Sequence, residues 1–533
     1  MKIKKTLLLI LTPLLIALYP ISRVYLVNID AIPLLHSFFA IISCSIVFSF
    51  ALFTICLIYK SLEKGSLIVS LSLIMLYSIN ILYFYILVPI SIQLNRITLF
   101  GLRIFRVSYI LIPILLFIIY CLIKIHKANH INPFISKILF VTFLALHAVT
   151  LVQLSVKIQN NNQSIKEYDY LNATTKKHLL EKAKLAKTEW SLKNLPDIYF
   201  IILDSYSSNK QLQEVYSFNN SSFTNSLKKM GFVVFDDIMS NYECTKYSLP
   251  SILNMNYIPA QIDPLPTNHL WANNNVTFFL EQLGYKIVNH LKVDTFNSEV
   301  SLFTYKDKSI TNYILQELKD FYFGSHSFFQ TIISQNPILS SFVPKIFDQL
   351  SWQYSQTKTL EKLSSLEQIS NIPQPKFVYA HFMCPHTPWV WDKGEIPLDI
   401  KKIEKAFERT LQTSYIYSIK FINKQILKII DKIITKSKQP PIIILQSDHA
   451  FGGSFNYKKE KLDLVDEKTK LEIFYSYYFP NHTQKSTSKN ISPVNNFRHI
   501  LNYYFNAKLK LLKDEYFILT SEKPTFKNLI TEY

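Results

Sequence analysis

Apolar residues gather in long runs in the first third of the chain. Five runs are each close to the roughly 20 residues that a helix needs to cross a bilayer core; they lie at 6–22, 35–59, 66–89, 107–125 and 135–156. Together with a hydrophobic content of 49% over the whole chain, they predict an N-terminal bundle of about five transmembrane helices over residues 1–158. Almost no ionisable residue lies inside the runs, which argues against a transporter.

A polar and charged segment follows at residues 159–195. Its apolar residues recur at near-helical spacing and are Leu179, Leu180, Ala183, Ala186 and Trp190. The pattern predicts a juxtamembrane connector with one amphipathic helix, whose apolar stripe packs on the next domain or on the membrane surface.

From residue 196 onward, short apolar strands alternate with helices. Strands are predicted at 197–203, 231–235, 285–288, 376–380 and just before Ser447, and the longest helix is predicted at 403–436. Nearly continuous apolar strands are typical of a sheet that is covered on both faces. Residues 196–533 are therefore predicted to form an α/β domain with a mostly parallel sheet between helical layers, and residues 311–370 to form a helical and irregular insertion or lid.

Two of the predicted strands end in candidate metal ligands. Asp204 closes the strand at 197–203, and Asp448 and His449 follow the strand that ends at Ser447. The carboxyl ends of strands in open α/β sheets gather ligands, and a carboxylate beside an imidazole suits a divalent cation. Taken alone, Asp204 fits equally well as a cap of the following helix.

A hydroxyl-rich segment between these strands holds the candidate nucleophile. Thr245 is expected at the start of a helix, where a hydroxyl is either a simple cap or a nucleophile favoured by the helix amides and an adjacent cation. Ser248 and Ser251 are rival hydroxyls, and spacing does not choose among the three.

A histidine segment follows another predicted strand. His386 lies between prolines that fix its backbone, and it suits a hydrogen bond to a phosphoryl oxygen or protonation of a leaving group. His381 is either a satisfied core histidine or a substrate contact. Trp389 either lines the mouth of a pocket or packs beside proline.

The charge distribution predicts the orientation in the membrane. Lysines at 2, 4, 5, 60, 64, 124 and 127 lie on the cytoplasmic side if the N-terminus stays inside, and an odd number of crossings then exports the large domain. Arg23, Arg96, Arg103 and Arg106 oppose this orientation. The prediction is a multi-pass protein of the inner (plasma) membrane with its large domain on the periplasmic or extracellular side.

The net charge of +19 does not by itself indicate a basic binding surface, because Lys, Asn and Ile are abundant and Gly is scarce, as codon bias predicts. No segment resembles a nucleic-acid motif, so nucleic acid is not expected as a partner. Cys244 and Cys384 fall in the exported part, where a disulfide between them is an open alternative.

Five ordered blocks together resemble the alkaline phosphatase superfamily, specifically its membrane-bound sulfatase-like hydrolases and transferases, such as lipoteichoic acid synthase and phosphoethanolamine transferases. The blocks are Ile202-Leu-Asp204-Ser, Asn241-Tyr-x-x-Thr245-x-x-Ser248-Leu-x-Ser251-x-Leu-Asn254, Ala380-His381-x-x-x-Pro385-His386-x-Pro388, Gln446-Ser-Asp-His449 and the late Asn-Asn-Phe-Arg…Asn-Tyr-Tyr-Phe segment.

The resemblance implies one divalent metal ion, Mn or Zn, bound by Asp204, Asp448, His449 and Thr245. It implies that Thr245 is the nucleophile of a phosphotransferase or phosphohydrolase and that His386 contacts the transferred group. The expected substrate is a phosphate-containing membrane lipid or an anionic glycan of the cell envelope.

Two departures from the family pattern sharpen this expectation. Sulfatases of the superfamily need Cys-x-Pro-x-Arg, whereas Cys244 is followed by Thr-Lys-Tyr-Ser, which disfavours the alternative of a sulfate-ester hydrolase. Many members carry two carboxylates after the first strand, whereas Asp204 is followed by Ser205, which suggests one metal rather than two. A catalytically idle scaffold or sensor is the remaining alternative.

Overall fold

The structure is a computed structural model. It describes residues 2–27, 34–81, 98–99, 102–103, 120, 123–125, 127–128, 133–189, 195–259, 267–289, 300–301, 345–369, 372, 375–387, 389–393, 396–397, 411–451, 455–456, 461–462, 467–480, 492–519 and 526–528. Contacts divide the chain into two compact units. One comprises Met1–Gln159, with the N-terminal helices, and Tyr313–Ser351; the other comprises Asn160–Asn312 and Trp352–Tyr533 and contains the large sheet.

The first unit is built from apolar helices. They are α1 (Lys2–Val27), α2 (Leu34–Tyr59), α3 (Leu62–Ile81) and the first part of α6 (Pro133–Glu189). The short strands β1 (Thr98–Leu99) and β2 (Leu102–Arg103) pair in an antiparallel arrangement. Helices α1, α2 and α3 contact one another, and the core between them includes Ala17, Phe48, Leu52 and Val69.

Within the described part of the chain, three helices are long and apolar enough to cross a membrane, and they lie at Lys4–Leu26, His36–Tyr59 and Phe134–Glu189. They contain the runs predicted at 6–22 and 135–156, and all but the first residue of the run predicted at 35–59. The run at 66–89 begins in α3 and continues past the described residues, and nearly all of the run at 107–125 lies outside them. Three apolar helices are therefore found, and the predicted count of five is not confirmed.

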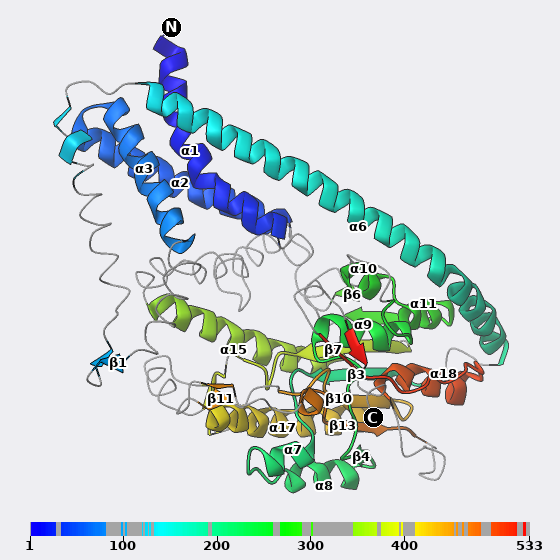
Figure 1. Cartoon of the computed structure of the whole chain (residues 1–533). Coiled ribbons are helices and arrows are strands. Elements are labelled where there is room, and N and C mark those ends of the chain that lie inside the picture. The colour runs from blue at the N-terminus through cyan, green and yellow to red at the C-terminus, as the bar shows by residue number, and fades with distance from the viewer. Residues whose placement is uncertain are drawn as a thin grey trace. The chain divides into compact units, whose positions relative to one another are not determined.

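The second unit is an α/β domain around a seven-stranded sheet (Figure 1). The strand order is β4-β13-β10-β3-β7-β5-β6. Only β13 runs antiparallel to its neighbours β10 and β4, and the other pairings are parallel. The strands are β3 (Ile198–Leu203), β4 (Val233–Phe235), β5 (Lys286–Asn289), β6 (Val300–Ser301), β7 (Lys376–Phe382), β10 (Ile442–Gln446) and β13 (Tyr475–Tyr478).

Helices cover both faces of this sheet, because alternate residues of each buried strand point to opposite sides. In β3, Ile198, Phe200 and Ile202 enter one core cluster, and Tyr199, Ile201 and Leu203 enter the other. The first face packs α9 (Thr245–Asn254), α11 (Asn275–Gln282) and α18 (Asn496–Phe505). The second packs α7 (Asn209–Glu214), α8 (Ser221–Lys229), α15 (Lys345–Gln368) and α17 (Leu411–Lys436).

Short elements complete this unit. They are α10 (Thr267–Ala272), the 3₁₀ helices η5 (Glu467–Lys470) and η7 (Pro493–Asn495), and the hairpins β8 (Trp391–Asp392) with β9 (Ile396–Pro397), β11 (Phe455–Asn456) with β12 (Lys461–Leu462), and β14 (Phe517–Leu519) with β15 (Phe526–Asn528).

The predicted connector is part of a longer element than the sequence suggested. The last membrane run and the connector helix form one continuous helix, α6, of 57 residues (Figure 1). Its apolar stripe joins the core on the α9 side of the sheet through Leu179, Ala183 and Ala186, and Trp190 lies outside the described residues. Of the predicted insertion at 311–370, the structure describes the helix α15 at its C-terminal end.

Candidate active site

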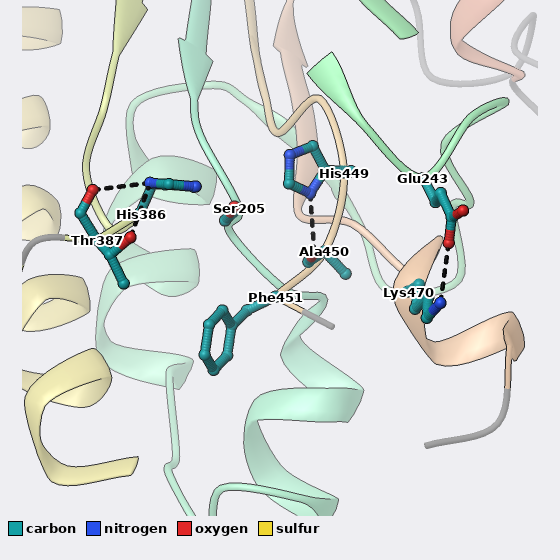
Figure 2. A pocket seen from close by; sticks show the side chains of 8 residues that line it. All are labelled: Ser205, Glu243, His386, Thr387, His449, Ala450, Phe451 and Lys470. Atoms are coloured by element: carbon teal, nitrogen blue, oxygen red, sulfur yellow. Dashed lines mark hydrogen bonds and ion pairs between the residues drawn. The ribbon is translucent and has the colours of Figure 1, made fainter. Parts of the chain in front are cut away.

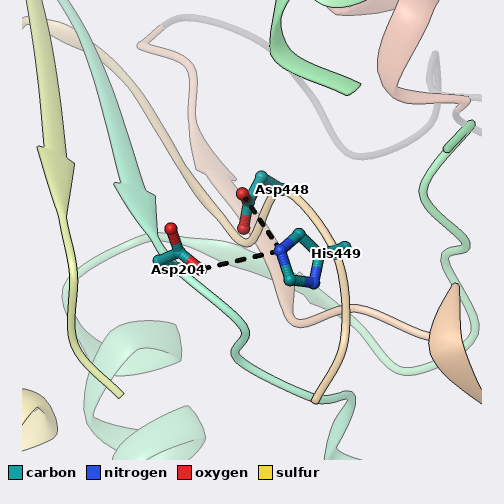
Figure 3. Close-up of side chains that lie close together, drawn as sticks. All are labelled: Asp204, Asp448 and His449. Atoms are coloured by element: carbon teal, nitrogen blue, oxygen red, sulfur yellow. Dashed lines mark ion pairs between the residues drawn. The ribbon is translucent and has the colours of Figure 1, made fainter. Parts of the chain in front are cut away.

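The predicted ligands meet because two neighbouring parallel strands end at the same edge of the sheet. In the pairing of β10 with β3, Gln446 lies opposite Ile202, so Asp448 and Asp204 each follow the paired residues by two positions. His449 Nε2 lies 3.6 Å from Asp204 Oδ1 and 3.6 Å from Asp448 Oδ2 (Figure 3). Ligand atoms of the three residues all lie within 4.8 Å of one another, which is close enough to share one ion.

Each carboxylate turns one oxygen toward this centre, and the other oxygen is bonded elsewhere in the protein; the near oxygens also accept hydrogen bonds, from the Ser205 hydroxyl at Asp204 Oδ1 and from Thr245 at Asp448 Oδ2. Asp204 Oδ2 accepts a hydrogen bond of 3.0 Å from His381 Nε2, and its Oδ1 lies on the His449 side. Asp448 Oδ1 accepts a bond of 3.2 Å from the Ser205 backbone N–H, and its Oδ2 faces His449 and Thr245. Both aspartates are therefore arranged to give a cation one oxygen each.

Thr245 brings a hydroxyl to the same centre. It is the first residue of α9, after Cys244 in an extended conformation, and its Oγ1 donates a hydrogen bond of 2.5 Å to Asp448 Oδ2. The backbone amides at a helix N-terminus favour negative charge. The position therefore suits a hydroxyl that must become an alkoxide.

The rival hydroxyls are buried and bonded to the backbone. Ser248 donates to the Asp448 carbonyl oxygen at 2.7 Å, as does Ser240 at 2.5 Å. Ser251 donates to the Ser248 carbonyl oxygen at 2.7 Å. Ser240 and Ser248 thus hold the loop that carries Asp448 and His449, and of the three candidate hydroxyls Thr245 is the one that meets a carboxylate of the centre.

The charges of the centre fit a divalent cation. Burial raises the pKa of Asp204, but the hydrogen bond from His381 and the charges of His381, His449 and His386 outweigh it and hold that pKa below its ordinary value. Burial lowers the pKa of His449, but the neighbouring Asp448 and Asp204 outweigh it and raise that pKa. Two fully buried carboxylates are costly without a compensating charge, and a carboxylate, imidazole and hydroxyl set is one that a divalent metal completes.

A cavity of about 320 Å³ opens beside the centre. Figure 2 shows the residues that line it, which are Ser205, Glu243, His386, Thr387, His449, Ala450, Phe451 and Lys470. Lys470 Nζ donates to Glu243 Oε2 at 3.0 Å, and in this view the pair lies across the cavity from His386. His386 Nδ1 donates to the Thr387 carbonyl oxygen at 2.8 Å, which fixes its tautomer.

A protein-family model described as Sulfatase matches residues 196–504, more than half of the chain. The chain belongs to the Sulfatase family. The predicted resemblance to membrane-bound enzymes of the alkaline phosphatase superfamily is thereby confirmed at the level of the family, as is its assignment as an enzyme. No curated protein matches the chain in a sequence comparison.

Three solved structures illustrate the likeness in fold. The C-terminal periplasmic domain of EcEptC from Escherichia coli is 12% identical, with a TM-score of 0.39, 63% of this chain covered and 93% of that chain. The lipooligosaccharide phosphoethanolamine transferase EptA from Neisseria meningitidis is 14% identical, with a TM-score of 0.38 and coverage of 94% and 95%. The lipoteichoic acid synthase LtaP from Listeria monocytogenes is 11% identical, with a TM-score of 0.34 and coverage of 58% and 72%.

In this Sulfatase-family chain, two residues that were predicted to contact substrate, His381 and Trp389, are not among those that line the cavity. His381 is buried in β7 behind Asp204, where it orients that carboxylate. Trp389 donates from Nε1 to the Pro385 carbonyl oxygen at 2.9 Å and packs edge-on against Phe451 with ring centroids 5.5 Å apart. Trp389 therefore packs on Phe451, which lines the cavity, and His386 is itself one of the lining residues.

Sequence reasoning missed Lys470 and Glu243. Glu243 lies two positions before Thr245, and this proximity could have indicated that it belongs to the site. Nothing in the sequence spacing connects Glu243 to Lys470. The thiols of Cys244 and Cys384 are both free, and burial raises the pKa of Cys244 to about 11, so this thiol is a poor nucleophile at neutral pH.

Proposed function

We propose that the chain is a metal-dependent phosphotransferase or phosphohydrolase in which Thr245 is the nucleophile. The observation that carries this proposal is the bond from Thr245 Oγ1 to Asp448, beside Asp204 and His449. A hydroxyl that meets the only described cluster of three potential metal ligands, at a helix N-terminus, has the surroundings that an activated nucleophile needs. An idle scaffold has no chemical need for this convergence.

We further propose that the metal is zinc rather than manganese. Asp204 and Asp448 each turn one oxygen toward His449, so with His449 and Thr245 they offer four single donor atoms. Four ligands of mixed nitrogen and oxygen suit tetrahedral Zn²⁺, whereas Mn²⁺ favours six oxygen ligands. When bound, the metal would act as a Lewis acid and lower the cost of an alkoxide.

The side chains around the cavity account for the remaining steps. The Thr245 oxygen forms a bond to phosphorus while the bond from phosphorus to the leaving oxygen breaks, and the hydroxyl proton of Thr245 is lost to solvent. When its imidazole carries a proton on both nitrogens, His386 is placed to give the Nε2 proton to the leaving oxygen, because its Nδ1 proton is bonded to the Thr387 carbonyl oxygen. Lys470 offers positive charge to the phosphoryl oxygens, and an alcohol or water then takes the group from Thr245 by the reverse sequence.

The apolar helices favour a transferase over a simple hydrolase. Three helices suited to crossing a membrane would keep the site near lipid donors and raise their effective concentration. We propose a lipid headgroup donor or an envelope glycan as substrate, with the catalytic domain on the outer side of the inner (plasma) membrane. A sulfate ester is disfavoured, because Cys244 lacks the Pro and Arg that its conversion to formylglycine needs.

Covalent labelling of the full-length protein tests this function. Zinc-loaded protein is incubated with vesicles of phosphatidylethanolamine and phosphatidylglycerol, and intact mass and peptide mapping locate the adduct and identify the transferred group. We expect the adduct on Thr245 in the wild type and in Thr357→Ala, which alters an exposed threonine of α15, and no adduct in Thr245→Ala.

Four results would contradict the proposal. An adduct on Ser248 would move the nucleophile, and unchanged turnover by Thr245→Ala would remove it from the reaction. Purified wild-type protein that binds no divalent metal would favour a scaffold. Hydrolysis of 4-nitrophenyl sulfate in preference to bis(4-nitrophenyl) phosphate would restore the sulfatase alternative.

A further inference from the structure

The C-terminal half of α6 is built into the core beneath the nucleophile helix. Leu179, Ala183 and Ala186 are almost fully buried. They share one core cluster with three residues of α9, which are Leu249, Ile252 and Leu253. The helix that contains a segment apolar enough to cross a membrane therefore also contributes side chains to the support of α9.

A pair of buried amides connects α6 to the end of α9. Asn172 of α6 and Asn275 of α11 donate to each other's side-chain oxygen, each at 3.1 Å. Asn275 Nδ2 also donates to the carbonyl oxygen of Asn254, the last residue of α9, at 3.0 Å. Both side chains are buried, and a buried amide that loses its partner is costly, so the pair fixes these helices in one arrangement.

Contacts of α6 also reach the residues around the start of α9. Tyr168 is buried in a second cluster with Tyr242 and Tyr247, which precede and follow Thr245. The neighbouring Asp169 pairs with His269 of α10 at 2.9 Å, and α10 contacts α9. Residues of α6 are thus linked to both ends of the helix that begins with Thr245.

We propose that residues 168–186 of α6 are a positioning element that holds Thr245 against Asp448. The inference rests on the proposed function, because it gives Thr245 a reaction to perform. A ten-residue helix is stiff, so a change at Asn254 is transmitted to Thr245 at the other end. Displacement of a reacting group by about 1 Å costs on the order of a hundredfold in rate, and Asn172 acts by preventing such displacement without touching substrate.

Single-turnover labelling of Thr245 in full-length, zinc-loaded protein tests this role, with vesicles of phosphatidylethanolamine and phosphatidylglycerol as the probe. For Asn172→Ala we expect a labelling rate at saturating lipid that is lower by about tenfold to a hundredfold, with an unchanged half-saturating lipid concentration. Asn172→Asp keeps an acceptor for Asn275 Nδ2 and should fall between this variant and the wild type. The matched control is Tyr170→Ala, two residues away and 81% exposed, which should label like the wild type.

Zinc content and thermal unfolding are measured on the same preparations. The inference is overturned if Asn172→Ala labels as fast as the wild type, or if its loss of rate only follows a loss of folded, zinc-bearing protein. Thr245→Ala runs in parallel to separate the two proposals. If Thr245→Ala stays active, the proposed function fails; if it is inactive while Asn172→Ala is normal, only the positioning role fails.

Discussion

Replacing His381 provides the sharpest test of how the metal centre is organised. His381→Ala removes the N–H that donates to Asp204 Oδ2 at 3.0 Å. Both residues are buried, so water is a poor substitute for the lost donor, and the carboxylate is then free to turn Oδ1 away from His449. The variant keeps all four proposed ligands and changes only the orientation of one.

The structure sets the size of the expected effect. A hydrogen bond to a charged group contributes about 1.5–3 kcal/mol, and about 1.4 kcal/mol corresponds to a factor of ten in an equilibrium constant. We therefore expect the zinc dissociation constant to rise by about tenfold to a hundredfold, the range found when a partner that orients a ligand is lost. His381→Gln retains an N–H donor and should lose less.

Zinc affinity is measured by competition with a chromogenic chelator on purified full-length protein. His178→Gln is the matched control, because it also removes one histidine, from an exposed position on α6, and it should bind zinc like the wild type. A dissociation constant for His381→Ala that equals the wild-type value would refute the view that His381 orients Asp204, and with it the argument for four single donor atoms.

Two further predictions concern charge. Lys470→Met removes a positive charge from the cavity, so the half-saturating concentration of bis(4-nitrophenyl) phosphate should rise and become less sensitive to salt; an unchanged salt dependence would exclude Lys470 from substrate binding. The second prediction concerns pH, because the acidic neighbours of His449 raise its pKa above the ordinary value of 6.5. Its proton stabilises the metal-free fold below that value, and this contribution is lost as the pH rises through the raised pKa. Because zinc needs the neutral imidazole, the rise in melting temperature on adding zinc should grow as the pH rises toward the raised pKa of His449 and level off above it; an equal rise at all pH values, or the same trend in His449→Gln, would contradict this.

The proximity of Asp204 to Asp448 and His449 could be predicted from the sequence, because the positions of these proposed ligands follow from the strands themselves. Asp204 and Asp448 each come directly after an apolar strand, and parallel neighbours bring such ends together. The role of Thr245 was left open beside Ser248 and Ser251, because three hydroxyls within two turns of helix differ in direction rather than in sequence signal.

The positions of His381 and Lys470 in the site could not be read from the sequence, because no local pattern contains them. His381 lies inside β7, opposite Ile202 in the register of β3 with β7, and the sequence does not state that register. Lys470 belongs to the short 3₁₀ helix η5, which has no periodicity of its own. The apolar stripe of α6 was predicted, but not the Asn172 and Asn275 pair, because two amides 103 positions apart carry no local signal.

The contacts of Ser205 give a physical reason to propose one cation here rather than two. Its backbone N–H donates to Asp448 Oδ1 at 3.2 Å, and its hydroxyl donates to Asp204 Oδ1 at 3.0 Å. It holds this position with φ of 60°, in the left-handed region that a serine rarely adopts. A second carboxylate here would add a third negative charge beside two buried ones, which a single divalent cation could not neutralise. We infer that Ser205 replaces the need for a second metal by satisfying both carboxylates with neutral donors, and that the strained backbone is retained because it aims those donors.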